Sequence, residues 1–152
     1  MNSVQEQEKT LRVLLVEDTP RRQKLLQKVF RDHAWITVHT AARAIRFLTV
    51  YNFDLIMLDF DLAGKEKGED VALFISQSRN ASAKIIVHSM NFQKAKRIVE
   101  VLPQAVLVPL SKMTRDNATI RRLRLELSKG VEIDWTFVFG QNQKLESRAK
   151  VT

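Results

Sequence analysis

Short apolar runs alternate with helical patterns along most of this chain. The run LRVLLVE (11–17) consists almost entirely of leucine and valine, which is typical of a strand buried on both faces. Four more runs of this kind follow: WITVHT (35–40), LIML (55–58), KIIVHS (84–89) and QAVLVP (104–109). Strands that alternate with helices in this way indicate a parallel sheet.

The segments between these runs repeat their apolar residues at the spacing of one helical face. The first begins at Thr19-Pro20, an N-cap residue followed by a proline at the first helical position. The same period recurs at 41–51, around 71–75, at 95–102 and around 120–127. We therefore predict an α/β fold, a doubly wound five-stranded parallel sheet flanked by helices.

The length of 152 residues suits one domain that buries roughly two-thirds of its unfolded surface. We expect a polar N-terminal tail at 1–10, the α/β domain at 11–129 and a short C-terminal extension at 130–152. Within that extension, VEIDWTFVFG (131–140) favours an added strand or a packed segment, and the polar end is expected to be disordered.

Several classes of protein are excluded by composition. The chain has no cysteine, so it has neither a disulfide framework nor a thiolate metal site. No apolar run approaches the roughly 20 residues of a membrane span. The polar start MNSVQEQEKT lacks the hydrophobic region of a signal peptide. A cytoplasmic location is expected.

The net charge of +8 raises the possibility of a nucleic-acid partner. Residues 1–110 carry 16 basic and 12 acidic side chains, and residues 111–152 carry 9 and 5. Each part is therefore +4, and the bias is denser in the shorter one. A basic adaptor that docks nucleic acid through 111–152 is one alternative, although basic residues on helices are usually a solvated face.

Polar residues stand where three of the predicted strands end: Glu17-Asp18, Asp59 and His88-Ser89. In a doubly wound sheet these ends share one edge, where sites are expected. Crowded carboxylates repel one another unless a cation is present, and Mg²⁺ takes carboxylate oxygens together with phosphate oxygens. A metal-held carboxylate near the hydroxyl of Ser89 would suit phosphoryl transfer to Asp59. The structural alternative is that Asp18 caps a helix and Asp59 ends a strand.

At these residues the chain resembles the receiver domains of two-component response regulators, which have the CheY-like (flavodoxin-like) fold. VLLVEDTPRR resembles their acidic-pair strand, LIMLDFDL their phospho-acceptor strand and IIVHS the strand that carries their Ser or Thr. The resemblance covers roughly residues 11–128. The spacings of 41 residues from Asp18 to Asp59 and 30 from Asp59 to Ser89 fit the receiver pattern.

The resemblance implies a role for each matching position. Asp59 would be the phospho-acceptor, and Ser89 would contact the phosphoryl group. Glu17 and Asp18 would hold Mg²⁺, with Asp59 and the backbone carbonyl of Asp61 as further ligands. A histidine kinase or another signalling protein would be the partner.

One position departs from the receiver pattern. Receivers carry a lysine just before the proline that follows the fifth strand, and here Val108 occupies that place. Ala105 occupies the position of their aromatic switch residue, and Lys112 lies further along the chain. Stable phosphorylation of Asp59 is therefore expected to be poor unless Lys112 or another group replaces the missing cation.

A second resemblance is to the cyclic-phosphate-processing receiver variants, which also lack that lysine. They tend to show Asp-His-Asp-Leu, Gly-Tyr-Asp-Val and His-Ser-x-Asn. Here Phe60 replaces the first histidine and Glu69 replaces the tyrosine, while His88, Ser89 and Asn91 remain. From residue type alone, His88 suits a buried core position, and Asn91 suits the cap of the next helix.

The sequence thus favours an atypical single-domain response regulator receiver in a phosphorelay, with output through partner binding. The main alternative is a metal-dependent phosphohydrolase that uses Asp59 and His88 on a cyclic phosphate. Nucleic-acid binding through 111–152 is the second alternative.

Overall fold

A computed structural model describes residues 7–140 of the chain, and the outer parts of both predicted tails, 1–6 and 141–152, lie outside the described residues. It contains a single five-stranded sheet within those residues. The strands are β1 (Arg12–Val16), β2 (Ala34–Val38), β3 (Leu55–Leu58), β4 (Lys84–Val87) and β5 (Val106–Leu107).

The strands lie in the order β2-β1-β3-β4-β5, and all neighbouring pairs are parallel. The chain moves outward from β1 in one direction and then in the other, so the predicted doubly wound sheet is confirmed. β3 is buried throughout, and β1 is buried after Arg12. This burial on both faces explains why these runs are continuously apolar rather than alternating.

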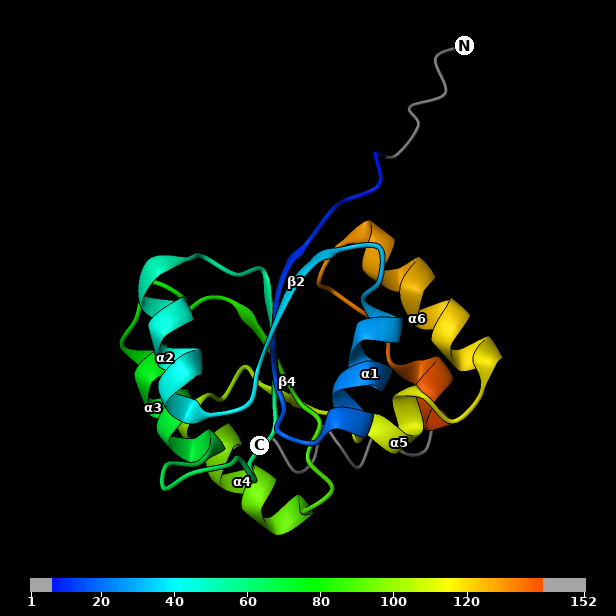
Figure 1. The fold of residues 1–152 in the computed structure, drawn as a ribbon. Coiled ribbons are helices and arrows are strands. Elements are labelled where there is room, and N and C mark those ends of the chain that lie inside the picture. The colour runs from blue at the N-terminus through cyan, green and yellow to red at the C-terminus, as the bar shows by residue number, and fades with distance from the viewer. Residues whose placement is uncertain (1–6, 141–152) are drawn as a thin grey trace.

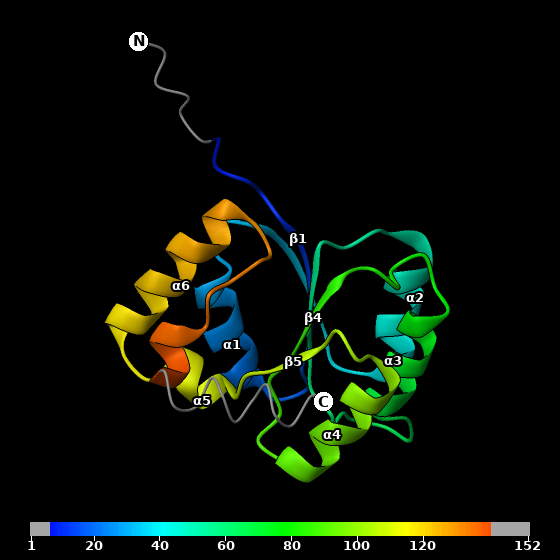
Figure 2. The same cartoon turned by 180° about the vertical axis from the view of Figure 1, so that it is seen from behind.

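Helices cover both faces of the sheet (Figures 1 and 2). One layer contains α2 (Ala41–Val50), α3 (Gly68–Ser76) and α4 (Phe92–Val101). The other contains α1 (Pro20–Val29), the short α5 (Leu110–Met113) and α6 (Asn117–Lys129). None of these helices has both the length and the apolar character that crossing a membrane requires.

Two hydrophobic clusters separate these layers from the sheet. Alternate residues of β1 enter opposite clusters, because successive side chains of a strand point to opposite faces. Leu14 and Val16 pack with α2, α3 and α4, whereas Val13 and Leu15 pack with α1 and α6. The alternation continues past each strand end, and it therefore decides which helical layer a site residue faces.

The described part of the C-terminal extension packs against the layer of α1 and α6. Val138 is buried, and Trp135, Phe137 and Phe139 are partly buried against the same cluster. Residues 136–140 are helical, so the expectation of a packed segment is confirmed and that of an added strand is wrong. Its aromatic side chains cover an apolar surface of the domain, where a strand would instead have needed a hydrogen-bonding partner.

Candidate functional site

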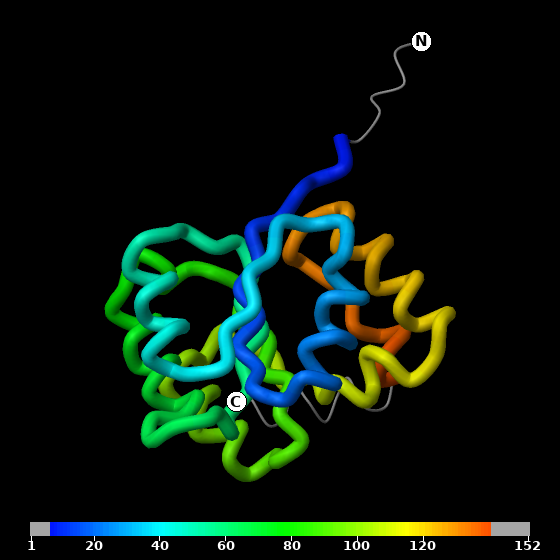
Figure 3. Tube along the Cα trace, in the orientation of Figure 1, coloured from blue at the N-terminus to red at the C-terminus, as the bar shows by residue number. Residues whose placement is uncertain are grey.

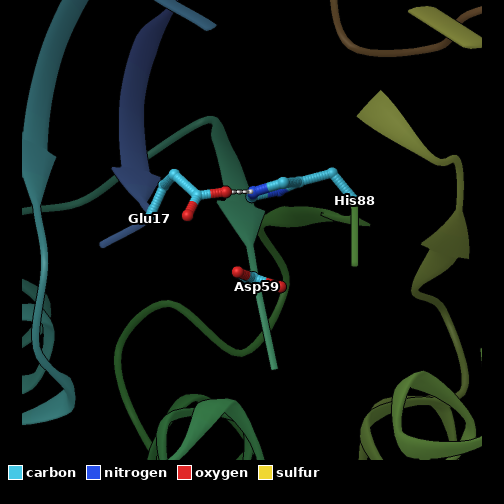
Figure 4. Close-up of side chains that lie close together, drawn as sticks. All are labelled: Glu17, Asp59 and His88. Carbon is cyan, nitrogen blue, oxygen red and sulfur yellow. Dashed lines mark hydrogen bonds and ion pairs between the residues drawn. The ribbon is translucent and has the colours of Figure 1, made fainter. Parts of the chain in front are cut away.

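Glu17, Asp59 and His88 converge at the carboxyl edge of the sheet, each directly after its strand (Figure 4). The loops that leave these strands turn at one edge of the molecule, which is the lower edge in Figure 3. All three residues are almost fully buried, with 0%, 2% and 0% of their surfaces exposed. One ligand atom from each residue lies within 4.8 Å of the others.

The sheet ladder holds these three residues in line. The amide of Asp59 donates to the carbonyl of Val16 at 3.1 Å, and the amide of His88 donates to that of Leu58 at 3.1 Å. The ladder thus continues one residue beyond each strand. Since Met57 lies on the α1 side of the sheet, alternation directs Asp59 to that side as well.

Arg22 of α1 completes the cluster, although no sequence pattern pointed to it. Its Nη1 lies 3.2 Å from Oε1 of Glu17 and 3.3 Å from Oδ2 of Asp59. Its Nη2 donates to the carbonyl of His88 at 3.0 Å. One guanidinium therefore contacts all three site residues, which offsets part of the cost of burying two carboxylates.

The environment shifts the pKa values of the two carboxyl groups in opposite directions. Burial raises the pKa of Asp59 to about 6, and the charge of Glu17 adds to the rise against the opposing effects of His88 and Arg22. Burial also acts to raise the pKa of Glu17, but the hydrogen bond and charge of His88, together with the Thr19 amide and the charge of Arg22, keep that pKa below its ordinary value. Of the two carboxyl groups, Asp59 is therefore the one that gains a proton more readily.

His88 is oriented by Glu17. Its Nε2 lies 3.0 Å from Oε1 of Glu17, and because an ionised carboxylate only accepts, Nε2 is the donor. Nδ1 of the same ring is buried and has no hydrogen-bond partner among the described residues.

The other predicted site residues lie around this cluster. Asp18 is partly buried and accepts from the hydroxyl of Thr19 at 3.4 Å. The carboxylate of Asp61 is exposed and pairs with Lys94 at 3.3 Å. Thus, of the four predicted metal ligands, the structure brings the side chains of Glu17 and Asp59 together, and His88 joins them.

Ser89 follows His88 and is buried, but its hydroxyl is engaged locally. Its Oγ accepts from the amide of Asn91 at 3.2 Å. The side chain of Asn91 in turn accepts from the amide of Lys94 at 3.1 Å, so Asn91 caps α4 as predicted.

Val108 and Lys112 do not supply the cation that the receiver pattern places beside the acceptor. Val108 is fully buried in the apolar cluster beneath α1 and α6, and its amide donates to the carbonyl of Val87 at 2.9 Å. The ammonium of Lys112 lies over the ring of Phe139, 5.3 Å from its centroid. Within residues 7–140, Arg22 is the cation that contacts Asp59.

Gly68 allows α3 to begin directly against the backbone of Asp59. The amide of Gly68 donates to the carbonyl of Phe60 at 2.8 Å. A Cβ atom at position 68 would lie 2.1 Å from the carbonyl oxygen of Asp59, which is well inside van der Waals contact. Only glycine fits at this position, so the start of α3 fixes the loop that follows Asp59.

The donors present suit a divalent cation. Two carboxylates and one imidazole lie within reach of a single ion, and the carboxylates need positive charge where they are buried. Carboxylate oxygens suit Mg²⁺ and Mn²⁺, and an imidazole nitrogen extends the range to softer ions. The cluster therefore has the composition of a metal site.

Residues 12–104 match the family described as the cyclic-phosphate processing receiver domain. No curated protein matches the chain significantly.

Solved structures of receivers share the fold. The Mn²⁺-bound form of response regulator Rcp1 is 22% identical, with a TM-score of 0.62 over 82% of this chain and 96% of that one. Response regulator TrrA from Thermotoga maritima, in complex with Mg²⁺-BeF, is 22% identical, with a TM-score of 0.57 over 74% and 97%. The receiver domain of a sensor histidine kinase from Pseudomonas aeruginosa, with magnesium in its active site cleft, is 18% identical, with a TM-score of 0.60 over 76% and 98%.

Proposed function

Since the chain belongs to the family of cyclic-phosphate processing receiver domains, we propose that it is an atypical receiver in a phosphorelay and that Asp59 accepts the phosphoryl group. One observation carries this proposal. Asp59 is a buried carboxylate at the carboxyl edge of the sheet, in contact with the guanidinium of Arg22 and within one ligand cluster with Glu17.

In this proposal a carboxylate oxygen of Asp59 attacks the phosphorus of a donor, and the bond from phosphorus to the donor's leaving group breaks as the new bond forms. The phosphoryl oxygens carry negative charge that a nearby cation stabilises. Arg22 is already 3.3 Å from Asp59 and has several N–H groups, so we assign it this role in place of the absent lysine.

We propose Mg²⁺ as the cofactor, held by the carboxylates of Glu17 and Asp59 with Asp18 and the carbonyl of Asp61 as the remaining protein ligands. When bound, the ion supplies positive charge for the phosphoryl oxygens. The nitrogen of His88 lies in the same cluster, which supports Mn²⁺ as a substitute. In the same proposal Ser89 would contact the phosphoryl group, as the receiver pattern implies.

We further propose that a histidine kinase or another signalling protein supplies the phosphoryl group in the cytoplasm. We also propose that its output comes through partner proteins that recognise its phosphorylated state.

The test is labelling by a small phosphodonor such as acetyl phosphate, with Mg²⁺ or Mn²⁺, followed by intact mass measurement. We expect one phosphoryl adduct in the wild type, loss of the adduct in Asp59→Asn and retention in Asp61→Asn, which keeps the backbone carbonyl. Arg22→Gln should lower the labelling about ten- to a hundredfold, since a hydrogen bond to a charged group is worth roughly 1.5–3 kcal/mol. An adduct that persists in Asp59→Asn would overturn the assignment.

A second candidate, hydrolysis of a cyclic phosphate, is favoured by the pairing of His88 with Glu17. An imidazole oriented by a carboxylate is a common general base or acid. Hydrolysis would add water across one phosphate ester bond and leave a monoester and a free hydroxyl. Turnover of 2′,3′-cyclic nucleotides that is lost in both His88→Ala and Asp59→Asn would support this reaction, and turnover that survives in His88→Ala would refute it.

A further inference from the structure

The outward side of α1 carries a row of basic side chains. Arg21, Lys24 and Lys28 are exposed, and their spacing of three and four residues puts them on one side of the helix. They span roughly 10 Å along the axis, at a rise of about 1.5 Å per residue. Arg31, also exposed, follows in the turn after α1 and extends the row.

α6 adds a second row beside the first. The guanidinium of Arg124 donates to the carbonyl of Lys28 through Nη2 at 2.7 Å and Nε at 3.1 Å. Arg121 is exposed one turn earlier on the same side of α6. Figures 1 and 2 both show α1 and α6 side by side. We call the two rows together the basic ridge: Arg21, Lys24, Lys28, Arg31, Arg121 and Arg124.

Little acidic charge compensates the ridge. Asp32 lies 3.7 Å from Arg31, but both side chains are more than 60% exposed, and such pairs contribute little. On α6, the carboxylate of Glu126 pairs with Arg122 instead. Burial and the neighbouring charge of Arg31 both lower the pKa of Arg124, as expected where cations crowd together.

We propose that the basic ridge binds the phosphodiester backbone of a nucleic acid. The regular rows of cations suit a polymer with regularly spaced phosphates, and each phosphate that is neutralised releases a counterion. On α1 and α6 the only large exposed apolar side chain is Leu125, so the described ridge offers no aromatic surface for stacked bases. Recognition would therefore be independent of base sequence.

A membrane surface fits the ridge less well than a nucleic acid does. A helix that lies on a membrane needs an apolar side beside its basic one. The apolar sides of α1 and α6, which include Leu26, Leu123 and Leu127, are buried against the sheet.

Four of the six ridge cations precede residue 111, so this surface differs from the 111–152 segment that the charge distribution in the sequence suggested.

The test uses two triple variants that remove the same charge from opposite faces. Lys24→Gln, Lys28→Gln and Arg31→Gln neutralise the ridge. Arg43→Gln, Arg46→Gln and Arg97→Gln neutralise exposed cations on α2 and α4, on the other face of the sheet. All six side chains are exposed, and thermal unfolding of both variants checks that they fold.

Fluorescence anisotropy would measure binding to labelled mixed-sequence 20-mers, single-stranded and double-stranded, between about 50 and 200 mM salt. We expect the wild type and the control triple to bind one or both oligonucleotides with similar affinity and a steep salt dependence. The ridge triple should bind at least about tenfold more weakly, with a salt slope reduced by about three.

Three results would overturn the proposal: no binding to either oligonucleotide at low salt, equal losses in the two triples, or tighter binding to polyglutamate or phosphatidylserine vesicles than to both oligonucleotides. The second of these would mean that net charge alone drives the binding.

Discussion

The guanidinium of Arg22 lies 3.3 Å from the carboxylate of Asp59, at the edge of the sheet where receivers have their sites. The same Nη1 is 3.2 Å from Glu17. A divalent ion held by these two carboxylates would share their negative charge with the guanidinium. Arg22 and the metal would therefore compete for the same negative charge.

This competition predicts the effect of Arg22→Gln on metal affinity. The variant removes a positive charge near the ion, so Mn²⁺ should bind more tightly, by about tenfold or roughly 1.4 kcal/mol. Isothermal titration calorimetry would measure the change. Arg21→Gln on the exposed side of the same helix is the control and should alter the affinity little. Weaker binding in Arg22→Gln would show that the guanidinium helps to hold the ion.

Asp59 should make stability depend on pH. Its pKa is about 6 in the folded protein against an ordinary value of 3.8, so the folded state binds the proton more tightly. The resulting stabilisation is complete below about pH 4 and is lost as the pH rises through about 6. The loss is at most about 3 kcal/mol, at roughly 1.36 kcal/mol per pKa unit.

Urea unfolding of the wild type and of Asp59→Asn over this pH range would measure the effect. The asparagine variant should be the more stable of the two above about pH 7, and the difference should shrink towards about pH 4. Asp61→Asn, which changes an exposed carboxylate, should follow the wild type. A pH-independent difference between the wild type and Asp59→Asn would contradict the raised pKa.

Gly68→Ala should disturb the site by displacing the backbone around Asp59. The new Cβ would lie 2.1 Å from the carbonyl oxygen of Asp59, so α3 or the loop has to shift, at a cost of about 1–3 kcal/mol in unfolding free energy. Mn²⁺ binding should weaken because Asp59 moves with its backbone.

Gly64→Ala is the matched control for this change. Gly64 has a φ of +93°, but a Cβ atom added there would have no neighbour within 4 Å, so alanine costs about 1 kcal/mol through backbone strain alone. Metal affinity should stay unchanged. Equal losses of affinity in both variants would mean that loop stability, and not the contact with Asp59, controls the site.

Leu123 and Leu125 provide a test of how α6 is docked. Leu123 is 1% exposed and lies in the cluster beneath α1, whereas Leu125 is 51% exposed. Leu123→Ala should lower the unfolding free energy by about 2–5 kcal/mol, and Leu125→Ala by less than about 0.5 kcal/mol. Chemical denaturation would measure both, and similar values for the two variants would contradict the docked orientation.

Most of the fold could be predicted from the sequence, because strands that are buried on both faces consist almost entirely of apolar residues. β1 and β3 are continuous apolar runs, and the polar residues that end them identify the functional edge. Asp59 and Glu17 could be paired in advance because parallel strands end at one edge. His88 could be placed at that edge but not assigned to either carboxylate, since its contact with Glu17 depends on the side-chain conformation.

Arg22 could not be predicted in the same way. Its role depends on how α1 crosses the sheet and how far a long side chain reaches, and neither leaves a periodic pattern in the sequence. In PRRQKLL it is one of two adjacent arginines, and only the packing of Leu26 against the sheet decides which of them turns inward. The C-terminal segment was ambiguous for a related reason, because alternating aromatic residues suit a strand and a packed turn of helix equally.

The most direct test of Asp59 as phospho-acceptor is the NMR signal of the Arg22 Nε–H group in the presence of Mg²⁺ and beryllofluoride, a phosphoryl mimic. We predict that beryllofluoride added to the Mg²⁺-loaded protein shifts this signal beyond its position with Mg²⁺ alone, and that beryllofluoride without Mg²⁺ leaves it unchanged, because the mimic completes its coordination on Asp59 beside the guanidinium. In Asp59→Asn the shift should vanish, while the Arg21 signal stays constant in both proteins. An Arg22 signal that is unchanged in the wild type, or that shifts equally in Asp59→Asn, would contradict the account.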